Sequence, residues 1–124
     1  MSARKPSAPV SLPALLDRFL DHLRVERGLA RLTLEAYRRD LATVTSYLLE
    51  RNVTEPDRIT PAVLQGFLAA RTAAGYAPAS VARCSAALRT WLKYLHGEGR
   101  LAADPTVLLD APKPQQRLPR ALSR

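Results

Sequence analysis

The sequence predicts an all-α fold with four main helices and a short fifth helix. Apolar residues recur at three- and four-residue intervals in four separate segments, which is the period of an amphipathic helix. Helix-capping residues and glycines bound these segments, and the alternating pattern of a β-strand is absent from the sequence. The chain has 124 residues, of which 47% are hydrophobic, so it is long enough for one domain with its own core.

The first helix is expected to begin after Ser11, a good N-cap residue, and to run to about Arg27. Gly28 then occupies the position where a helix commonly ends in a left-handed residue. The residues that share the apolar face of this helix are Leu12, Leu15, Leu16, Phe19, Leu20 and Leu23. We expect this face to be buried.

The second helix is expected from about Thr33 to Arg51. If Leu41 faces the interior, a rotation of about 100° per residue places further core residues on the same side. These are Leu34, Tyr37, Val44 and Leu48. Arg39 then points away from the core and Arg38 lies at the margin, so this helix combines a core face with a basic edge.

The third helix is expected from the N-cap Thr60 to about Ala74, with Pro61 in its first turn, and the fourth from Pro78 to about Gly97. The apolar face of the third helix comprises Val63, Leu64, Phe67 and Leu68. The apolar face of the fourth comprises Val81, Cys84, Leu88, Trp91, Leu92 and Leu95. The opposite side of the fourth helix carries Arg83, Ala86, Thr90 and Lys93, with Arg89 to one side. Small residues flanked by cations allow a phosphate backbone to approach closely.

The remaining segments divide the chain into an arm, a body and a tail. Residues 1–10 are expected to form a flexible arm and residues 11–111 the helical domain. Asp104 and Pro105 resemble the start of a short fifth helix that reaches about Leu109. Residues 112–124 are rich in proline and arginine and are expected to form a basic linker or tail.

The charge balance predicts a polyanionic partner. The chain has 19 Lys and Arg against 11 Asp and Glu, a net charge of +8 and a pI of about 10.6, and nucleic acid is the commonest partner of such a chain. No acidic residue lies between Asp57 and Glu98, so the cations of that segment have no acidic partner nearby in sequence. An anionic membrane is less suitable, because the apolar faces are needed for the core.

Catalytic and metal-binding motifs are missing from the sequence. It has two histidines, one cysteine, no phosphate-binding glycine loop and no nucleophile motif. We therefore expect no enzyme activity, no metal and no cofactor, and we interpret Cys84 as a core residue. The absence of a cysteine framework, a signal peptide and a long apolar run predicts a cytoplasmic protein that does not enter membranes.

Four segments of the chain resemble the N-terminal, core-binding (SAM-like) domain of tyrosine recombinases of the Xer and phage-integrase type. They are FLDHLRVERGL (19–29), TLEAYRRDL (33–41), SVARCSAALRTWLKYLHGEGRLAADPT (80–106) and PKPQQRLPRALS (112–123). The resemblance implies an orthogonal bundle of helical hairpins that serves as a non-catalytic DNA-binding module for DNA integration and recombination. It also makes residues 112–124 a linker toward a catalytic domain that is absent here. Full-length members cut and rejoin DNA with a tyrosine of that later domain.

The resemblance also implies which residues contact duplex DNA. In this family the second and fourth helices face the DNA, and the positions carried over are Thr33, Tyr37, Arg38, Ser80, Arg83, Arg89 and Lys93, with Arg31 and Arg39 as additions. Leu32 and the pair Ala77 and Pro78 depart from the polar capping residues that are usual there. The family further implies contacts with other recombinase subunits on DNA, while we expect a monomer in free solution.

Two other functions agree with the same pattern. A helix-turn-helix regulator would use Gly28 and the two residues after it as a short turn between two helices, the second of which enters the major groove. A helical protein-interaction module would use the positive charge to bind an acidic protein. Insensitivity to competing DNA would distinguish the second of these from a DNA-binding domain.

Overall fold

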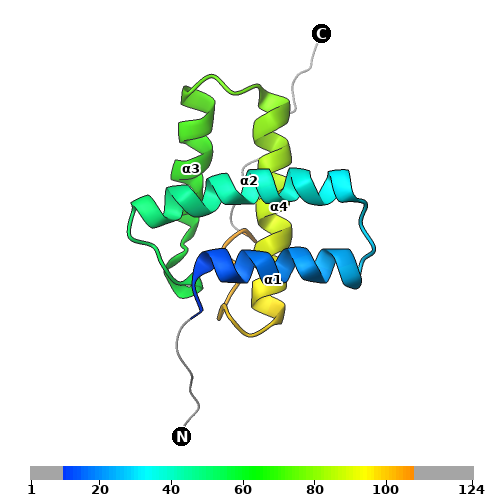
Figure 1. The fold of residues 1–124 in the computed structure, drawn as a ribbon. Coiled ribbons are helices and arrows are strands. Elements are labelled where there is room, and N and C mark those ends of the chain that lie inside the picture. Colours follow the sequence, from blue (N-terminus) through cyan, green and yellow to red (C-terminus); the bar gives the residue numbers. More distant parts are fainter. Residues whose placement is uncertain (1–9, 108–124) are drawn as a thin grey trace, which may run out of the picture.

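The computed structural model describes residues 10–107, which form four α-helices and one 3₁₀ helix with no strand in that range. The elements are α1 (Leu12–Val25), α2 (Arg31–Glu50), η2 (Pro56–Arg58), α3 (Pro61–Ala73) and α4 (Pro78–Gly97). Figure 1 shows α1 and α2 as one antiparallel pair and α3 and α4 as a second pair that lies crosswise to the first. The predicted all-α fold with four main helices is confirmed.

The helix starts follow the predicted caps where a polar side chain is present. The Oγ of Ser11 accepts a hydrogen bond from the backbone N–H of Ala14 at 3.2 Å, and Thr60 accepts one from Val63 at 3.2 Å. The start of α2 is different, because its N-cap is Ala30, which has no side chain that can cap. The helix begins at Arg31, two residues before the predicted Thr33.

The core is formed by the predicted apolar faces of the four helices. All six residues expected on the inner face of α1 are buried, as are Leu41, Val44 and Leu48 of α2. Trp91 of α4 is completely buried and is one of the largest side chains of this core. Tyr37 is only partly buried, so its ring reaches the core while its edge stays accessible.

The predicted fifth helix is not among the helices of residues 10–107, where Val107, at the end of that range, is the one helical residue after α4. Residues 104–106 form a turn in which the carboxylate of Asp104 accepts a hydrogen bond from the backbone N–H of Thr106 at 2.9 Å. The last two residues of that predicted helix, the basic linker 112–124 and most of the arm 1–10 lie outside the described residues. Within residues 10–107, no helix is both long and apolar enough to cross a membrane.

Candidate nucleic-acid interface

A groove between the first half of α2 and the middle of α4 joins three of the residues that were predicted to contact DNA. Thr33 and Tyr37 come from α2 and Arg83 comes from α4. The groove has a volume of about 360 Å³, and its lining is Leu32, Thr33, Ala36, Tyr37, Asp40, Arg83, Ala86 and Ala87. Because the alanines are small, a sugar-phosphate backbone could approach both helices closely at this place.

The ring of Tyr37 is held in the groove by aromatic contacts from α1. The buried Phe19 lies edge-on to Tyr37, with ring centroids 6.1 Å apart, and its other neighbour is Tyr94 of α4 at 5.2 Å. Phe19 therefore connects α1 with both helices that form the groove. Such aromatic pairs restrict the ring positions, so the phenol group of Tyr37 has a defined place at the groove wall.

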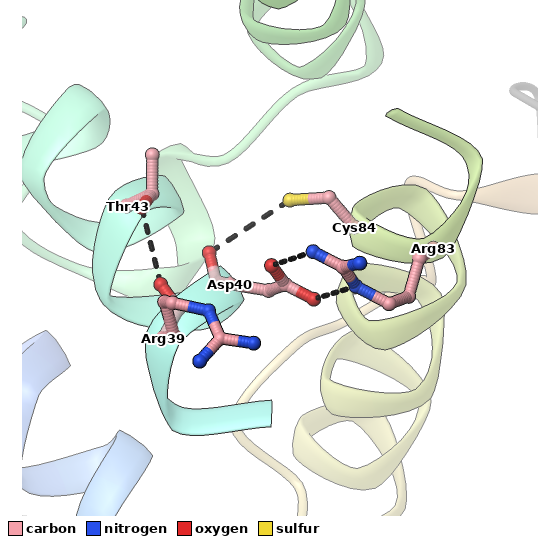
Figure 2. A network of polar contacts seen from close by, with 5 residues as sticks. All are labelled: Arg39, Asp40, Thr43, Arg83 and Cys84. Carbon is pink, nitrogen blue, oxygen red and sulfur yellow. Dashed lines mark hydrogen bonds and ion pairs between the residues drawn. The ribbon is translucent and has the colours of Figure 1, made fainter. Parts of the chain in front are cut away.

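Arg83 forms an ion pair with Asp40 that crosses from α4 to α2 (Figure 2). Its Nε donates to Oδ2 of Asp40 at 2.9 Å and its Nη2 donates to Oδ1 at 3.1 Å. The Asp40 side chain is only 5% exposed, whereas that of Arg83 is 53% exposed. The hydrogen bond and the negative charge of Asp40 raise the pKa of Arg83. Arg83 has no acidic partner nearby in sequence, as predicted, but an acid of another helix pairs with it across the packing contact of α2 and α4.

Asp40 is a residue of this groove that the sequence pattern did not single out. Its partner on α4 lies 43 positions away in sequence, and its backbone carbonyl also accepts a weak hydrogen bond from the Cys84 thiol at 3.8 Å. The sequence feature that could have indicated its role is its place directly after two arginines and before Leu41, a core residue. An acid at such a margin of a helix is placed to meet a cation on the helix that packs there.

Two predicted arginines face a different groove. Arg31 and Arg38 line a groove between α1 and α2 together with Asp17 and Glu35. Arg38 pairs with Asp17 at 3.3 Å and Arg31 with Glu35 at 3.8 Å. Both pairs are well exposed, and such pairs contribute about 0–1 kcal/mol. The two arginines are thus paired, contrary to a surface of free cations, but the pairs are weak enough to be replaced by another anion.

The other predicted positions lie along the two helices outside the groove lining. Arg39 and Lys93 are exposed, and neither forms an ion pair within residues 10–107. Arg89 is half-buried and donates from Nη2 to the hydroxyl of Ser85 at 3.2 Å. Ser80 lies in the first turn of α4, whose N-cap Ala77 offers no side-chain cap. The first backbone N–H groups of that helix therefore remain available to water or to an anion.

The described residues offer little for catalysis. No group of three or more His, Cys, Asp or Glu that could hold a metal lies within residues 10–107. Cys84 is buried, and desolvation raises its pKa to about 11, so its thiol is protonated at neutral pH. Burial, and then the charge of Glu98, raise the pKa of Tyr94. A thiolate or a phenolate nucleophile is therefore not favoured at either residue.

The helices of this chain are arranged as in a protein of known structure. A solved structure with the same fold is the N-terminal domain of a phage integrase/site-specific recombinase from Haloarcula marismortui, with a TM-score of 0.70 and 22% identity. The alignment covers 77% of this chain and 89% of that one. Residues 16–99 match the family described as phage integrase, N-terminal SAM-like domain. The chain belongs to this family, which confirms the predicted resemblance.

Several curated relatives are tyrosine recombinases. XerD from Yersinia pestis is 44% identical over 109 residues, and XerD from Listeria innocua is 40% identical over 110 residues. XerC from Azotobacter vinelandii is 40% identical over 111 residues. The alignments cover 88–90% of this chain but only 36–37% of these relatives, so the chain spans little more than a third of their length. The matched region is the N-terminal SAM-like domain of a tyrosine recombinase and not its catalytic domain.

The helix-turn-helix alternative does not agree with this arrangement. In that motif the two helices cross at about 90–120°. In this chain α1 and α2 lie side by side and antiparallel on either side of the turn at Gly28 (Figure 1). α2 is therefore held against α1 along its length and does not project as a separate recognition helix.

Proposed function

We propose that this domain binds duplex DNA as the non-catalytic half of a site-specific tyrosine recombinase and helps to clamp the DNA during recombination. The observation that carries the proposal is the groove between α2 and α4, which joins Thr33, Tyr37 and Arg83 on a chain of net charge +8. The similarity to the tyrosine recombinases XerD and XerC supports a role in recombination.

The groove and its surroundings have the donors that phosphate oxygens require. Thr33 offers a hydroxyl, Tyr37 a phenol and Arg83 the N–H groups that Asp40 does not use. Arg39 and Lys93 add exposed positive charge on the same two helices. Contacts of this type position a protein on DNA, and any base contacts in the groove would add a sequence preference.

The distribution of acids favours the α4 side of this surface. No acid lies between Asp57 and Glu98, and the acid on α2 that faces α4, Asp40, is buried and paired with Arg83. The groove between α1 and α2 is different, because its arginines share it with Asp17 and Glu35. We therefore place the main contact at α2 and α4 and assign Arg31 and Arg38 to its periphery.

The proposed partners are duplex DNA and, on DNA, other subunits of the recombinase. In free solution we expect the isolated domain to be a monomer, and a cytoplasmic location agrees with a DNA partner. The domain alone should bind weakly, with Kd values of about 10⁻⁴ to 10⁻⁶ M at physiological salt, as is typical of non-specific DNA binding.

A titration of duplex DNA at several salt concentrations tests the proposal. If about five phosphates are neutralised, log K should fall with log salt with a slope of about −4 to −5. Lys93→Glu and Arg39→Glu should weaken binding clearly. Arg18→Glu and Arg58→Glu are matched controls, because both residues are exposed, lie outside the α2/α4 groove lining and change the net charge by the same amount.

Three results would contradict the proposal in different ways. A slope near zero would remove its electrostatic basis. Equal effects of all four charge reversals would mean that the binding face is wrong and that only net charge matters. Binding to an acidic protein that competing DNA does not reduce would favour the protein-interaction alternative.

A further inference from the structure

We propose that Asp40 is a positioning residue for DNA binding, which holds Arg83 so that the open edge of its guanidinium receives a DNA phosphate. The inference rests on the proposed function, since it names how one residue of that surface recognises its ligand. Asp40 itself does not touch the DNA, because its carboxylate is buried beneath Arg83.

The first argument is the geometry of the pair. An arginine has five N–H donors, and Asp40 accepts one hydrogen bond from Nε and one from Nη2 of Arg83. Three N–H groups remain, and two of them lie parallel on the edge formed by Nη1 and Nη2. These two N–H groups can bind two oxygens of a phosphate, just as Nε and Nη2 bind the two oxygens of the carboxylate. Since the Arg83 side chain is 53% exposed and lines the groove, the edge is accessible.

The second argument is the rigidity of the carboxylate that holds Arg83. Asp40 is 5% exposed and directly precedes Leu41, which is completely buried. The backbone carbonyl of Asp40 also accepts a hydrogen bond from the thiol of Cys84 on α4 (Figure 2). The backbone of Asp40 is therefore held to α4 as well as to its own helix, and two hydrogen bonds to its buried carboxylate restrict the rotamers of Arg83. A donor that is ordered in advance does not lose this entropy when DNA binds.

The third argument concerns the sign of the charge. A carboxylate under a DNA-binding surface repels phosphate, so by charge alone Asp40 should weaken binding. A simple latch between α2 and α4 would not require that half of Arg83 remain exposed in a groove. The geometry agrees with a carboxylate whose benefit is the orientation of Arg83. Repulsion by charge alone and orientation of Arg83 predict opposite changes in DNA affinity when the negative charge of Asp40 is removed.

Asp40→Asn in the 124-residue chain separates these explanations. The substitution keeps the shape of the side chain but raises the net charge from +8 to +9, since one negative charge is lost. If charge alone matters, DNA binding becomes tighter. If Asp40 positions Arg83, binding becomes weaker by about tenfold, the size expected when a charge-assisted hydrogen bond to phosphate is lost.

Arg83→Lys is the second variant, and it leaves Asp40 in place. Lysine keeps the charge but has no planar fork, so we expect a loss of affinity similar to that of Asp40→Asn. The double variant should bind no more weakly than either single variant, because both remove the same contact. Arg18→Lys is the matched control, since Arg18 is exposed, lies outside the α2/α4 groove lining and undergoes the same exchange. Thermal unfolding of each variant establishes that it is folded at the temperature of the titration.

The possible outcomes are distinct. Weaker binding by Asp40→Asn and Arg83→Lys, with Arg18→Lys unchanged, supports the inference. Tighter or unchanged binding by Asp40→Asn would overturn it, and if that variant does not fold, unchanged binding by Arg83→Lys would overturn it instead. If the unmodified chain shows no salt-dependent DNA binding, the proposed function itself fails.

Discussion

Replacement of Phe19 by leucine should loosen the DNA-binding surface without touching it. Phe19 is 1% exposed, and its ring contacts Tyr37 at 6.1 Å and Tyr94 at 5.2 Å between centroids. Each aromatic pair contributes about 0.5–1.5 kcal/mol beyond its buried area, so Phe19→Leu should lower the free energy of unfolding by about 1–3 kcal/mol. For a domain of this size, 1 kcal/mol lowers Tm by about 4–8 °C.

The consequence for binding follows from the position of Tyr37. Without the edge of Phe19 beside it, the Tyr37 ring is less restricted at the groove wall, and DNA affinity should fall. Phe67→Leu is a suitable control, because Phe67 is equally buried and lies edge-on to Tyr47 with centroids 5.2 Å apart. Tyr47 does not line the α2/α4 groove, so this variant should lose stability but keep its affinity.

Two measurements decide the matter: thermal unfolding by circular dichroism, and DNA titration at a temperature at which both variants are folded. Loss of affinity in Phe19→Leu alone supports the role of Tyr37. The reasoning is refuted if both variants lose affinity equally, since binding would then follow general stability. It is refuted as well if Phe19→Leu is destabilised and binds DNA as the unmodified chain does.

Two further predictions concern stability. Gly28 has a φ of 63° and open space around an added Cβ, so Gly28→Ala should lower the free energy of unfolding in urea by about 1–2 kcal/mol. Gly97 has no positive φ, so Gly97→Ala should leave the free energy of unfolding unchanged. Burial raises the pKa of Cys84 from 9.0 to about 11, so the folded state keeps a proton that the unfolded state loses. Relative to Cys84→Ala, the unmodified chain should therefore be most stable below pH 9 and lose this advantage as the pH rises to about 11, which a pH series of urea unfolding measures.

The helices and the core could be predicted because their signals are local. The six buried residues of α1 follow one another at helical spacing, and Ser11 and Thr60 cap the helices that they precede. The start of α2 was predicted less well, since Ala30 carries no capping group that a sequence pattern would reveal. Local chemistry thus determines where most of the helices begin and which face is buried.

The ion pairs could not be predicted because they depend on how the helices pack. A projection of α2 alone places Arg38 at the margin of the core face, but it does not say which helix lies beyond that margin. The antiparallel packing of α1 brings Asp17 to Arg38, and the crossing of α4 brings Arg83 to Asp40 (Figure 1). Spacing alone therefore predicts the helices on which these charges lie but not the partners that packing gives them.

The cations of this surface differ in what an approaching phosphate must displace. The partners of Arg31 and Arg38 are exposed carboxylates, whose side chains can rotate toward the solvent when a phosphate takes their place. The partner of Arg83 is buried and has no solvent to turn toward, so a phosphate must add to the existing pair. Binding at Arg83 thus keeps the α2–α4 ion pair intact, whereas binding at Arg38 would exchange its α1–α2 pair for a phosphate contact. Only the first arrangement would let the domain bind DNA without loss of a contact between its helices, which is why the proposed interface is centred at Arg83.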